Sequence, residues 1–129
     1  MDVPEGLRYT QDHEWVKVSG TVGRVGITAF AQDQLGDIVF VELPAVGASV
    51  KAGAAFGVVE SVKSMSDLNA PVSGRVLAVN GALADHPEQV NKDPYGDGWM
   101  IEVELANAAE TNALMSAQEY ADSTKSAGH

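Results

Sequence analysis

Cysteine is absent from the sequence, and this absence excludes several kinds of chemistry at once. Disulfide bridges, zinc–thiolate sites and cysteine nucleophiles all require it. Any sulfur chemistry must therefore arrive on a cofactor. Basic residues are also scarce, since eight Lys and Arg stand against 18 Asp and Glu and give a formal net charge of −10. Neutralising phosphates needs clustered Lys and Arg, so the composition predicts no nucleic-acid partner.

Long apolar runs are missing as well. No stretch approaches the ~20 apolar residues that a membrane-spanning helix requires, and the start, MDVPEGLRYT, lacks the pattern of a secretory signal. We therefore expect no membrane association and a cytoplasmic protein. The mitochondrial matrix stays open, because a removed transit peptide leaves no trace. The length of 129 residues predicts a single domain, 1–129, with a core that needs no metal or disulfide.

Motifs for metal binding or autonomous catalysis are not found either. Asp85, His86 and Glu88 match no metal spacing, and a polar loop broken by proline is the simpler interpretation. Asp93 and Asp97 lack the alternating ligands and closing glutamate of a calcium loop. There is no P-loop, dinucleotide fingerprint or hydrolase triad. The sequence therefore predicts neither a metal site nor a catalytic residue.

The sequence does contain many short runs of β-branched residues separated by turn residues. Runs of about five residues at this spacing indicate an all-β sandwich or barrel. Asn80-Gly81 predicts a tight turn, because both residues tolerate positive φ. The runs lie at 13–18, 23–28, 37–43, 48–53, 56–61, 74–79 and 99–105.

Two stretches depart from this pattern and predict helices. The segment 28–35 (TAFAQDQL) has Thr28 as N-cap and is closed by Gly36. The segment 109–123 (AETNALMSAQEYADS) contains good helix formers and no Gly or Pro. We expect this C-terminal helix to pack over an open end of the barrel, followed by a frayed tail at 124–129.

The stretch VESVKSMSDLNAPVSG, at 59–74, places one lysine alone among apolar, hydroxylated and acidic residues. Apolar residues at 58, 62, 65 and 68 have helical spacing, so Lys63 could lie on an amphipathic helix and pair with Glu60. The adjacent valines and three serines instead favour a β-hairpin with Lys63 near its tip. On the residues alone both interpretations stay open.

An exposed lysine is protonated near neutral pH, and its activation needs an apolar pocket or a neighbouring cation. This segment supplies Glu60 and Asp67 instead, and Lys63 is the only basic residue from 52 to 74. The residues around Lys63 therefore disfavour a self-activated catalytic lysine, and two alternatives stay open. Lys63 is either an ordinary surface lysine, which general principles favour, or a flexible attachment point that a second enzyme modifies.

ESVKS followed by SDLNAPVSGRV resembles the lipoyl-lysine segment of lipoyl and biotinyl domains. In those domains the modified lysine lies at a β-turn, with an acid three residues before it and a glycine eleven residues after it. Biotin carriers usually have Met-Lys-Met, whereas this chain has Val-Lys-Ser, so the resemblance favours lipoate. It implies Lys63 as the attachment site and four motif residues that shape the hairpin and its recognition: Glu60, Ser61, Val62 and Gly74.

Further motifs occur in the order found in the H proteins of the glycine cleavage system. They are DHEWV, GIT with AQDQLGDIVFVELP, VGASVKAG and NKDPYGDGWMIEVEL, and the resemblance runs from about residue 7 to 120. It implies a barrel-sandwich hybrid of the lipoyl-domain type and a carrier that is not itself an enzyme. Alternatives are a lipoyl-relay or redox carrier outside glycine catabolism, a biotinyl carrier, or a structural domain with an unmodified lysine.

The resemblance also implies a cofactor and partners. A lipoate–protein ligase or lipoyltransferase would join (R)-lipoic acid to Lys63 as N6-lipoyl-lysine. The arm would receive an aminomethyl group from glycine decarboxylase (P protein) and present it to the tetrahydrofolate-dependent aminomethyltransferase (T protein). Dihydrolipoyl dehydrogenase (L protein) would then reoxidise it. We expect such a shuttle to be a monomer.

Family members hold the loaded arm in a surface cleft whose acids can pair with its ammonium group. By motif these acids correspond to Glu14 and Asp67, and a charge-assisted contact in a partly dry groove is stronger than a neutral one. The alternative is that Glu14 is an ordinary strand-face acid and that Asp67 forms a turn.

Overall fold

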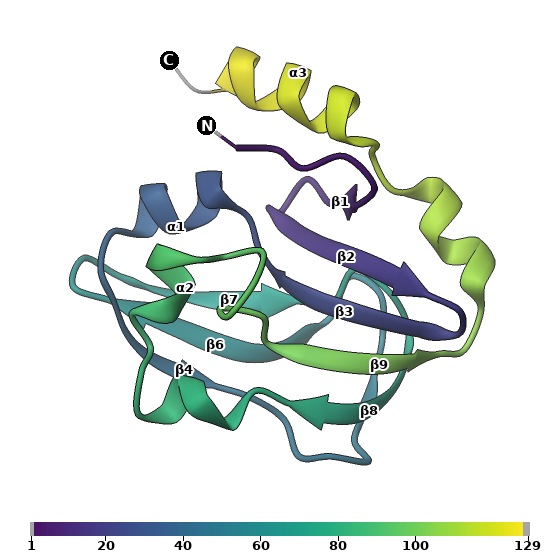
Figure 1. The fold of residues 1–129 in the computed structure, drawn as a ribbon, viewed down its shortest axis with the longest axis horizontal. Coiled ribbons are helices and arrows are strands. Elements are labelled where there is room, and N and C mark those ends of the chain that lie inside the picture. The colour runs from purple at the N-terminus through teal and green to yellow at the C-terminus, as the bar shows by residue number, and fades with distance from the viewer. Residues whose placement is uncertain (1, 128–129) are drawn as a thin grey trace.

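The computed structural model describes residues 2–127, with side chains through Lys125. Its chain forms two antiparallel sheets that pack as layers (Figure 1). One sheet has six strands in the order β1-β2-β3-β9-β8-β5, and the other has three in the order β4-β6-β7. The all-β class expected from the sequence is confirmed. Within the described residues, no helix is long and apolar enough to cross a membrane.

Each of the seven β-branched runs contains one strand, as predicted. The strands are β1 (Arg8–Tyr9), β2 (Glu14–Ser19), β3 (Val22–Ile27), β4 (Ile38–Glu42), β5 (Ser49–Val50), β6 (Ala55–Ser61), β7 (Met65–Asn69), β8 (Gly74–Val79) and β9 (Ile101–Leu105). The helices are α1 (Ala29–Leu35), α2 (Gln89–Lys92) and α3 (Ala117–Ala127), with 3₁₀ helices η1 (Gly81–Ala84) and η2 (Ala108–Ala113).

The main core lies between the facing sides of the two sheets, where both contribute alternate apolar residues. Val59 and Leu68 come from the three-stranded sheet, and Val25, Ile101 and Val103 from the six-stranded one; all five are at most 1% exposed. This packing fixes which face of each strand is turned outward, because shifting a strand by one residue would expose its apolar set.

A second, aromatic cluster lies where α3 and the N-terminal segment cover β1 and β2 (Figure 1). Tyr9 and Tyr120 stack with their ring centroids 4.7 Å apart, beside Trp15. The Tyr120 hydroxyl hydrogen-bonds to Thr28 Oγ1 at 2.7 Å and to His13 Nδ1 at 2.8 Å. The C-terminal helix therefore packs over one end of the sandwich, as expected.

The short helix predicted at 28–35 is confirmed as α1. Thr28 Oγ1 accepts a hydrogen bond from the Ala31 backbone N–H at 3.2 Å, and Gly36 ends the helix with φ +80°. Glycine adopts this left-handed conformation without a steric penalty.

The continuous helix predicted at 109–123 is wrong. Leu114 is extended between η2 and α3, and Met115 exchanges two backbone hydrogen bonds of 2.9 Å with Tyr9. This bridge to β1 overrides the helix propensity of the segment. A capping box restarts the helix, because Glu119 N–H donates to Ser116 Oγ and Ser116 N–H donates to Glu119 Oε1. The helix then continues to Ala127, so 124–127 are helical rather than a frayed tail, and 128–129 lie outside the described residues.

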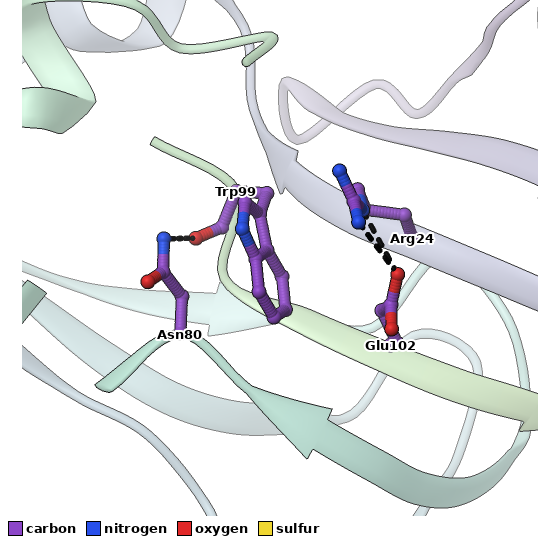
Figure 2. Close-up of polar contacts among 4 residues, drawn as sticks. All are labelled: Arg24, Asn80, Trp99 and Glu102. Atoms are coloured by element: carbon purple, nitrogen blue, oxygen red, sulfur yellow. Dashed lines mark hydrogen bonds and ion pairs between the residues drawn. The ribbon is translucent and has the colours of Figure 1, made fainter. Parts of the chain in front are cut away.

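The tight turn predicted at Asn80-Gly81 is also wrong, since η1 begins there and neither residue has positive φ. The Asn80 amide instead donates to the backbone carbonyls of Asp97 and Trp99, both at 2.8 Å. Figure 2 shows the contact with Trp99, together with the nearby ion pair between Arg24 and Glu102 on the outer face of the six-stranded sheet. Asn80 therefore anchors the loop before β9 rather than reversing the chain.

Candidate functional site

Lys63 lies in the turn that joins β6 to β7, with its side chain exposed. The two strands pair antiparallel, and Glu60 is opposite Met65. The hairpin interpretation is therefore confirmed and the amphipathic helix is wrong. The alternation of buried Val59, exposed Glu60 and buried Ser61 explains this outcome, since it matches the two-residue period of a strand. In Figure 1 the turn projects from the left edge of the molecule, below α1.

Ser61 fixes the backbone of this turn. Its Oγ accepts hydrogen bonds from the backbone N–H groups of Lys63 and Ser64, both at 3.1 Å, and Ser61 N–H donates to the Ser64 carbonyl at 2.8 Å. Val62 N–H donates to the Asp37 carbonyl at 3.0 Å, which ties the tip to the residue before β4. The tip backbone is thus held on both sides while the Lys63 side chain projects outward.

The lysine stem passes the C-terminal end of α1. A Cβ atom at Gly36 would lie 3.3 Å from Lys63 Cε and would crowd the stem. Sequence reasoning assigned Gly36 only to ending the helix, because nothing in the sequence indicates that two segments 27 residues apart (63 − 36) meet here. The lack of a side chain at Gly36 therefore has two effects: it allows the backbone conformation that ends α1, and it leaves room for the lysine stem.

Gly74 lies outside the hairpin. The prediction that it directly shapes the turn is therefore wrong. Gly74 is the first residue of β8, where it pairs with Val50 and Leu105 in the other sheet. A Cβ atom there would collide with the Glu104 carbonyl oxygen. Its place eleven residues after Lys63 therefore corresponds to the crossing of the chain from β7 to β8, where two backbones approach closely.

Glu14, the first residue of β2, is only 3% exposed. Its Oε1 accepts from Thr10 Oγ1 at 2.9 Å, and its Oε2 accepts from the Asn69 backbone N–H at 3.3 Å. Burial raises the pKa of Glu14 to about 8 although both hydrogen bonds act to lower it, and the nearby Asp12 carboxylate raises it further. This side chain is therefore biased toward its neutral form near neutral pH.

Asp67 is exposed on β7, opposite Val58. It precedes Asn69 by two residues, so the two side chains lie on the same face of the strand. Asn69 in turn contacts Glu14 through its backbone and Asp12 through Nδ2 at 3.3 Å. Asn69 therefore contacts Glu14 directly, whereas Asp67 only shares its strand and face with Asn69. Asp67 follows Lys63 by four residues and is the third residue of β7.

Sequence reasoning missed Thr10 and Asn69, which hold the Glu14 carboxyl group. From the sequence, Asn69 is only a polar residue before a turn. Its contact with Glu14 is made by the backbone N–H, which the residue type does not reveal. Chemically, the assembled residues offer one exposed amine on a fixed turn and one exposed acid, Asp67, on the strand that follows it. This arrangement suits attachment and holding of a side group rather than activation of a nucleophile.

Comparison with known proteins agrees with this interpretation. A family model described as glycine cleavage H-protein matches residues 7–127. A probable glycine cleavage system H protein of Haloarcula marismortui is 59% identical over 121 residues, covering 94% of this chain and 95% of that protein. The glycine cleavage system H protein of Carboxydothermus hydrogenoformans is 58% identical over 118 residues, covering 92% of this chain and 91% of that protein.

A solved structure is similar throughout. The crystal structure of a glycine cleavage system H protein from Mycobacterium marinum matches with a TM-score of 0.88 and 43% sequence identity, covering 95% of this chain and 99% of that one. The expected barrel-sandwich architecture of the lipoyl-domain type is thereby confirmed, as is the expected role of a lipoyl carrier in glycine cleavage. The chain therefore belongs to the glycine cleavage H-protein family, whose members are lipoyl carriers and not enzymes.

Proposed function

We propose that Lys63 is the residue of this carrier that bears lipoate, in amide linkage as N6-lipoyl-lysine. The observation that supports this most strongly is an exposed lysine on a turn whose backbone Ser61 holds in place. Gly36 leaves room beside the lysine stem. The bound group would supply a reactive disulfide that this cysteine-free chain cannot supply itself.

We further propose that the modified side chain passes in turn among the P, T and L proteins of the glycine cleavage system. A lipoate–protein ligase or lipoyltransferase would load it first. Relatives in a bacterium and an archaeon support a cytoplasmic location. A monomer suits the task, because one projecting tip then stays accessible to each enzyme.

Glu14 and Asp67 are the residues that we propose to receive the ammonium group of the loaded arm. An approaching cation favours the ionised form of a carboxyl group and lowers its pKa. Glu14, whose pKa burial raises to about 8, would therefore release a proton when the cation arrives. The exposed Asp67 lies between Lys63 and Asn69 along β7, so it would meet the arm first.

Intact-mass measurement tests the attachment site. The apo-protein is incubated with a lipoate–protein ligase, ATP and lipoate, beside the variants Lys63→Arg and Lys51→Arg. We expect a single lipoyl increment on the wild type and on Lys51→Arg, an exposed lysine on another loop, and none on Lys63→Arg. An increment retained by Lys63→Arg, or absent from the wild type, would refute the proposal. Loss of carbon dioxide exchange with P protein and glycine in Lys63→Arg would then connect attachment to function.

A further inference from the structure

The turn between β1 and β2 places Thr10 and Glu14 opposite each other. The Thr10 N–H donates to the Glu14 carbonyl at 2.9 Å, and the Glu14 N–H donates to Thr10 Oγ1 at 3.1 Å. Thr10 Oγ1 in turn donates to Glu14 Oε1 at 2.9 Å. The backbone and side chains of the two residues therefore form one closed set of hydrogen bonds around the buried carboxyl group.

His13 anchors this turn to the rest of the protein. Among the described residues it is the only one besides glycine with positive φ, at 70°. Its N–H donates to the Thr10 carbonyl at 3.2 Å, and its carbonyl accepts from the Thr28 N–H at 3.0 Å. Its ring bonds to the Tyr120 hydroxyl through Nδ1 and packs on Phe30, with ring centroids 4.7 Å apart. The position of Thr10 is therefore fixed through its neighbour as well as through Glu14.

The direction of the Thr10 hydroxyl hydrogen follows from these contacts. A hydroxyl group has one hydrogen and two lone pairs. Because Thr10 Oγ1 accepts from the Glu14 N–H, its one hydrogen is directed to its other partner, Glu14 Oε1. The carbonyl-type oxygen of a neutral carboxyl group is the better acceptor. The proton of neutral Glu14 therefore lies on Oε2, the oxygen that faces the Asn69 N–H of β7 at 3.3 Å.

The Glu14 carboxyl group has no cationic partner among the described residues. The basic residues of β1, β2 and β3 form no ion pair with it: Arg8, Lys17 and Arg24. The other titratable groups of the segments around it supply no positive charge near neutral pH: Asp12, Asp67, Tyr120 and His13, whose pKa burial lowers. The charge that balances an ionised Glu14 must therefore come from outside the chain.

We propose that Thr10 is a positioning residue of the arm site, because its hydroxyl occupies Oε1 of Glu14 and leaves Oε2 to receive the ammonium group of the loaded arm. When the cation arrives, Oε2 releases its proton to solvent, and the bond from Thr10 stabilises the carboxylate that results. The inference deepens the proposed function and rests on Glu14 being a residue that receives the loaded arm. It adds the receiving atom and the residue that selects this atom.

Carbon-13 NMR of the full-length apo-protein tests this role by titrating the Glu14 carboxyl group. Thr10→Val keeps the shape of the side chain but removes the donor, whereas Thr10→Ser keeps the donor. We expect Thr10→Val to lower the ionisation constant of Glu14 about tenfold, and Thr10→Ser to stay within about twofold of the wild type. Thr111→Val is the matched control, since it removes a hydroxyl that donates only within η2.

The titration separates positioning from structural support. Thr10→Val also leaves the Glu14 N–H without its acceptor, but this loss is common to both protonation states. It therefore lowers stability, which thermal unfolding measures, without moving the titration. Thr10→Ala supplies the same comparison should Thr10→Val fail to fold. The Asn69 N–H resonance should follow the Glu14 titration, because this group donates to Oε2.

Release of ammonia from the loaded arm supplies a second readout. The lipoylated protein is charged with P protein and glycine, and release is followed near neutral pH without T protein. Water converts an exposed aminomethyl thioether to thiol, formaldehyde and ammonium, so an arm that is held poorly loses its ammonia sooner. We expect release about tenfold faster from Thr10→Val, and wild-type rates from Thr10→Ser and Thr111→Val.

The outcomes distinguish this inference from the proposed function. An unchanged Glu14 titration or an unchanged release rate in Thr10→Val would overturn the role of Thr10, as would a Thr10→Ser variant that behaves like Thr10→Val. An Asn69 N–H resonance that does not follow the titration would exclude Oε2 as the receiving atom. Glu14→Gln tests the proposed function itself, because wild-type release from that variant would mean that Glu14 does not receive the arm.

Discussion

Among single residues, Glu14 is notable because it is an acid in a buried position, where the ionised carboxylate is disfavoured. The side chain is 3% exposed, which favours its neutral form, yet its two hydrogen-bond donors, Thr10 and the Asn69 backbone, favour the ionised form. The HEWV motif indicated an acid at this position and a cleft role for it. That the acid would be buried at the start of β2 could not be predicted, because a strand-face acid has the same sequence pattern when exposed.

We predict that Glu14 makes folding stability fall as pH rises. Its pKa is about 8 in the folded protein and ordinarily 4.5, so between these values the native state keeps a proton that the unfolded state has released. Stability present below pH 4.5 is therefore lost progressively as the pH rises to about 8, by on the order of 3 to 5 kcal/mol. Glu14→Gln should remove this slope, which urea unfolding at pH 5, 7 and 9 would measure.

Glu60→Gln is the matched control for Glu14→Gln, since Glu60 is an exposed strand acid on β6, in the other sheet. Its unfolding free energy should run parallel to that of the wild type across the same pH range. Parallel curves for Glu14→Gln as well would mean that the buried carboxyl does not carry the pH dependence.

At the level of elements, the hairpin shows why the local sequence pattern alone could not decide between a helix and two strands. Residues 58–68 fit a helix by spacing and a hairpin by composition, and MSDLN is a poor strand sequence on its own terms. β7 is a strand because it pairs with β6 and because Leu68 enters the core, where it packs with residues from distant parts of the chain. A contact between distant residues also explains why the continuous C-terminal helix was predicted wrongly, because Met115 pairs with Tyr9 instead of continuing a helix. The first helix was predictable because both its caps are local.

Gly74, where the chain passes from β7 in one sheet to β8 in the other, gives a prediction about stability. Gly74→Ala should lower the free energy of unfolding by about 2 kcal/mol or more, because the new methyl group meets the Glu104 carbonyl oxygen and backbone cannot move away cheaply. Gly81→Ala, where a Cβ atom meets nothing within 4 Å, should change it by less than about 0.5 kcal/mol. Denaturant unfolding of both variants measures the difference. Equal stability of the two would show that β8 and β9 can separate at this point.

Across the whole molecule, the aromatic cluster joins the C-terminal helix to the region of the lysine. The Tyr120 hydroxyl bonds to Thr28, Thr28 caps α1, and α1 ends at Gly36 beside the Lys63 stem. The residue pattern predicted a sandwich or barrel and the helix cap correctly, and the family resemblance implied the lysine turn. The sequence could not predict this path, because two of its links, Tyr120 to Thr28 and Gly36 to Lys63, join residues that are far apart in the chain.

Tyr120→Phe tests whether this path stabilises the molecule. It leaves the ring stack with Tyr9 in place but removes the hydroxyl partner of buried Thr28, which should cost roughly 1–2 kcal/mol of unfolding free energy. Thr124→Ala, which removes a hydroxyl that donates only within α3, should cost less than about 0.5 kcal/mol. Thermal unfolding compares the two variants. If Tyr120→Phe matched Thr124→Ala, the buried hydroxyl would not contribute to the stability of the fold.

The contact between Tyr120 and Thr28 also has a practical consequence for anyone who handles this protein. Truncating the chain before α3 would remove the Tyr120 hydroxyl and take a hydrogen-bond partner from both Thr28 and His13. Shortened versions of the carrier are therefore best ended after this helix.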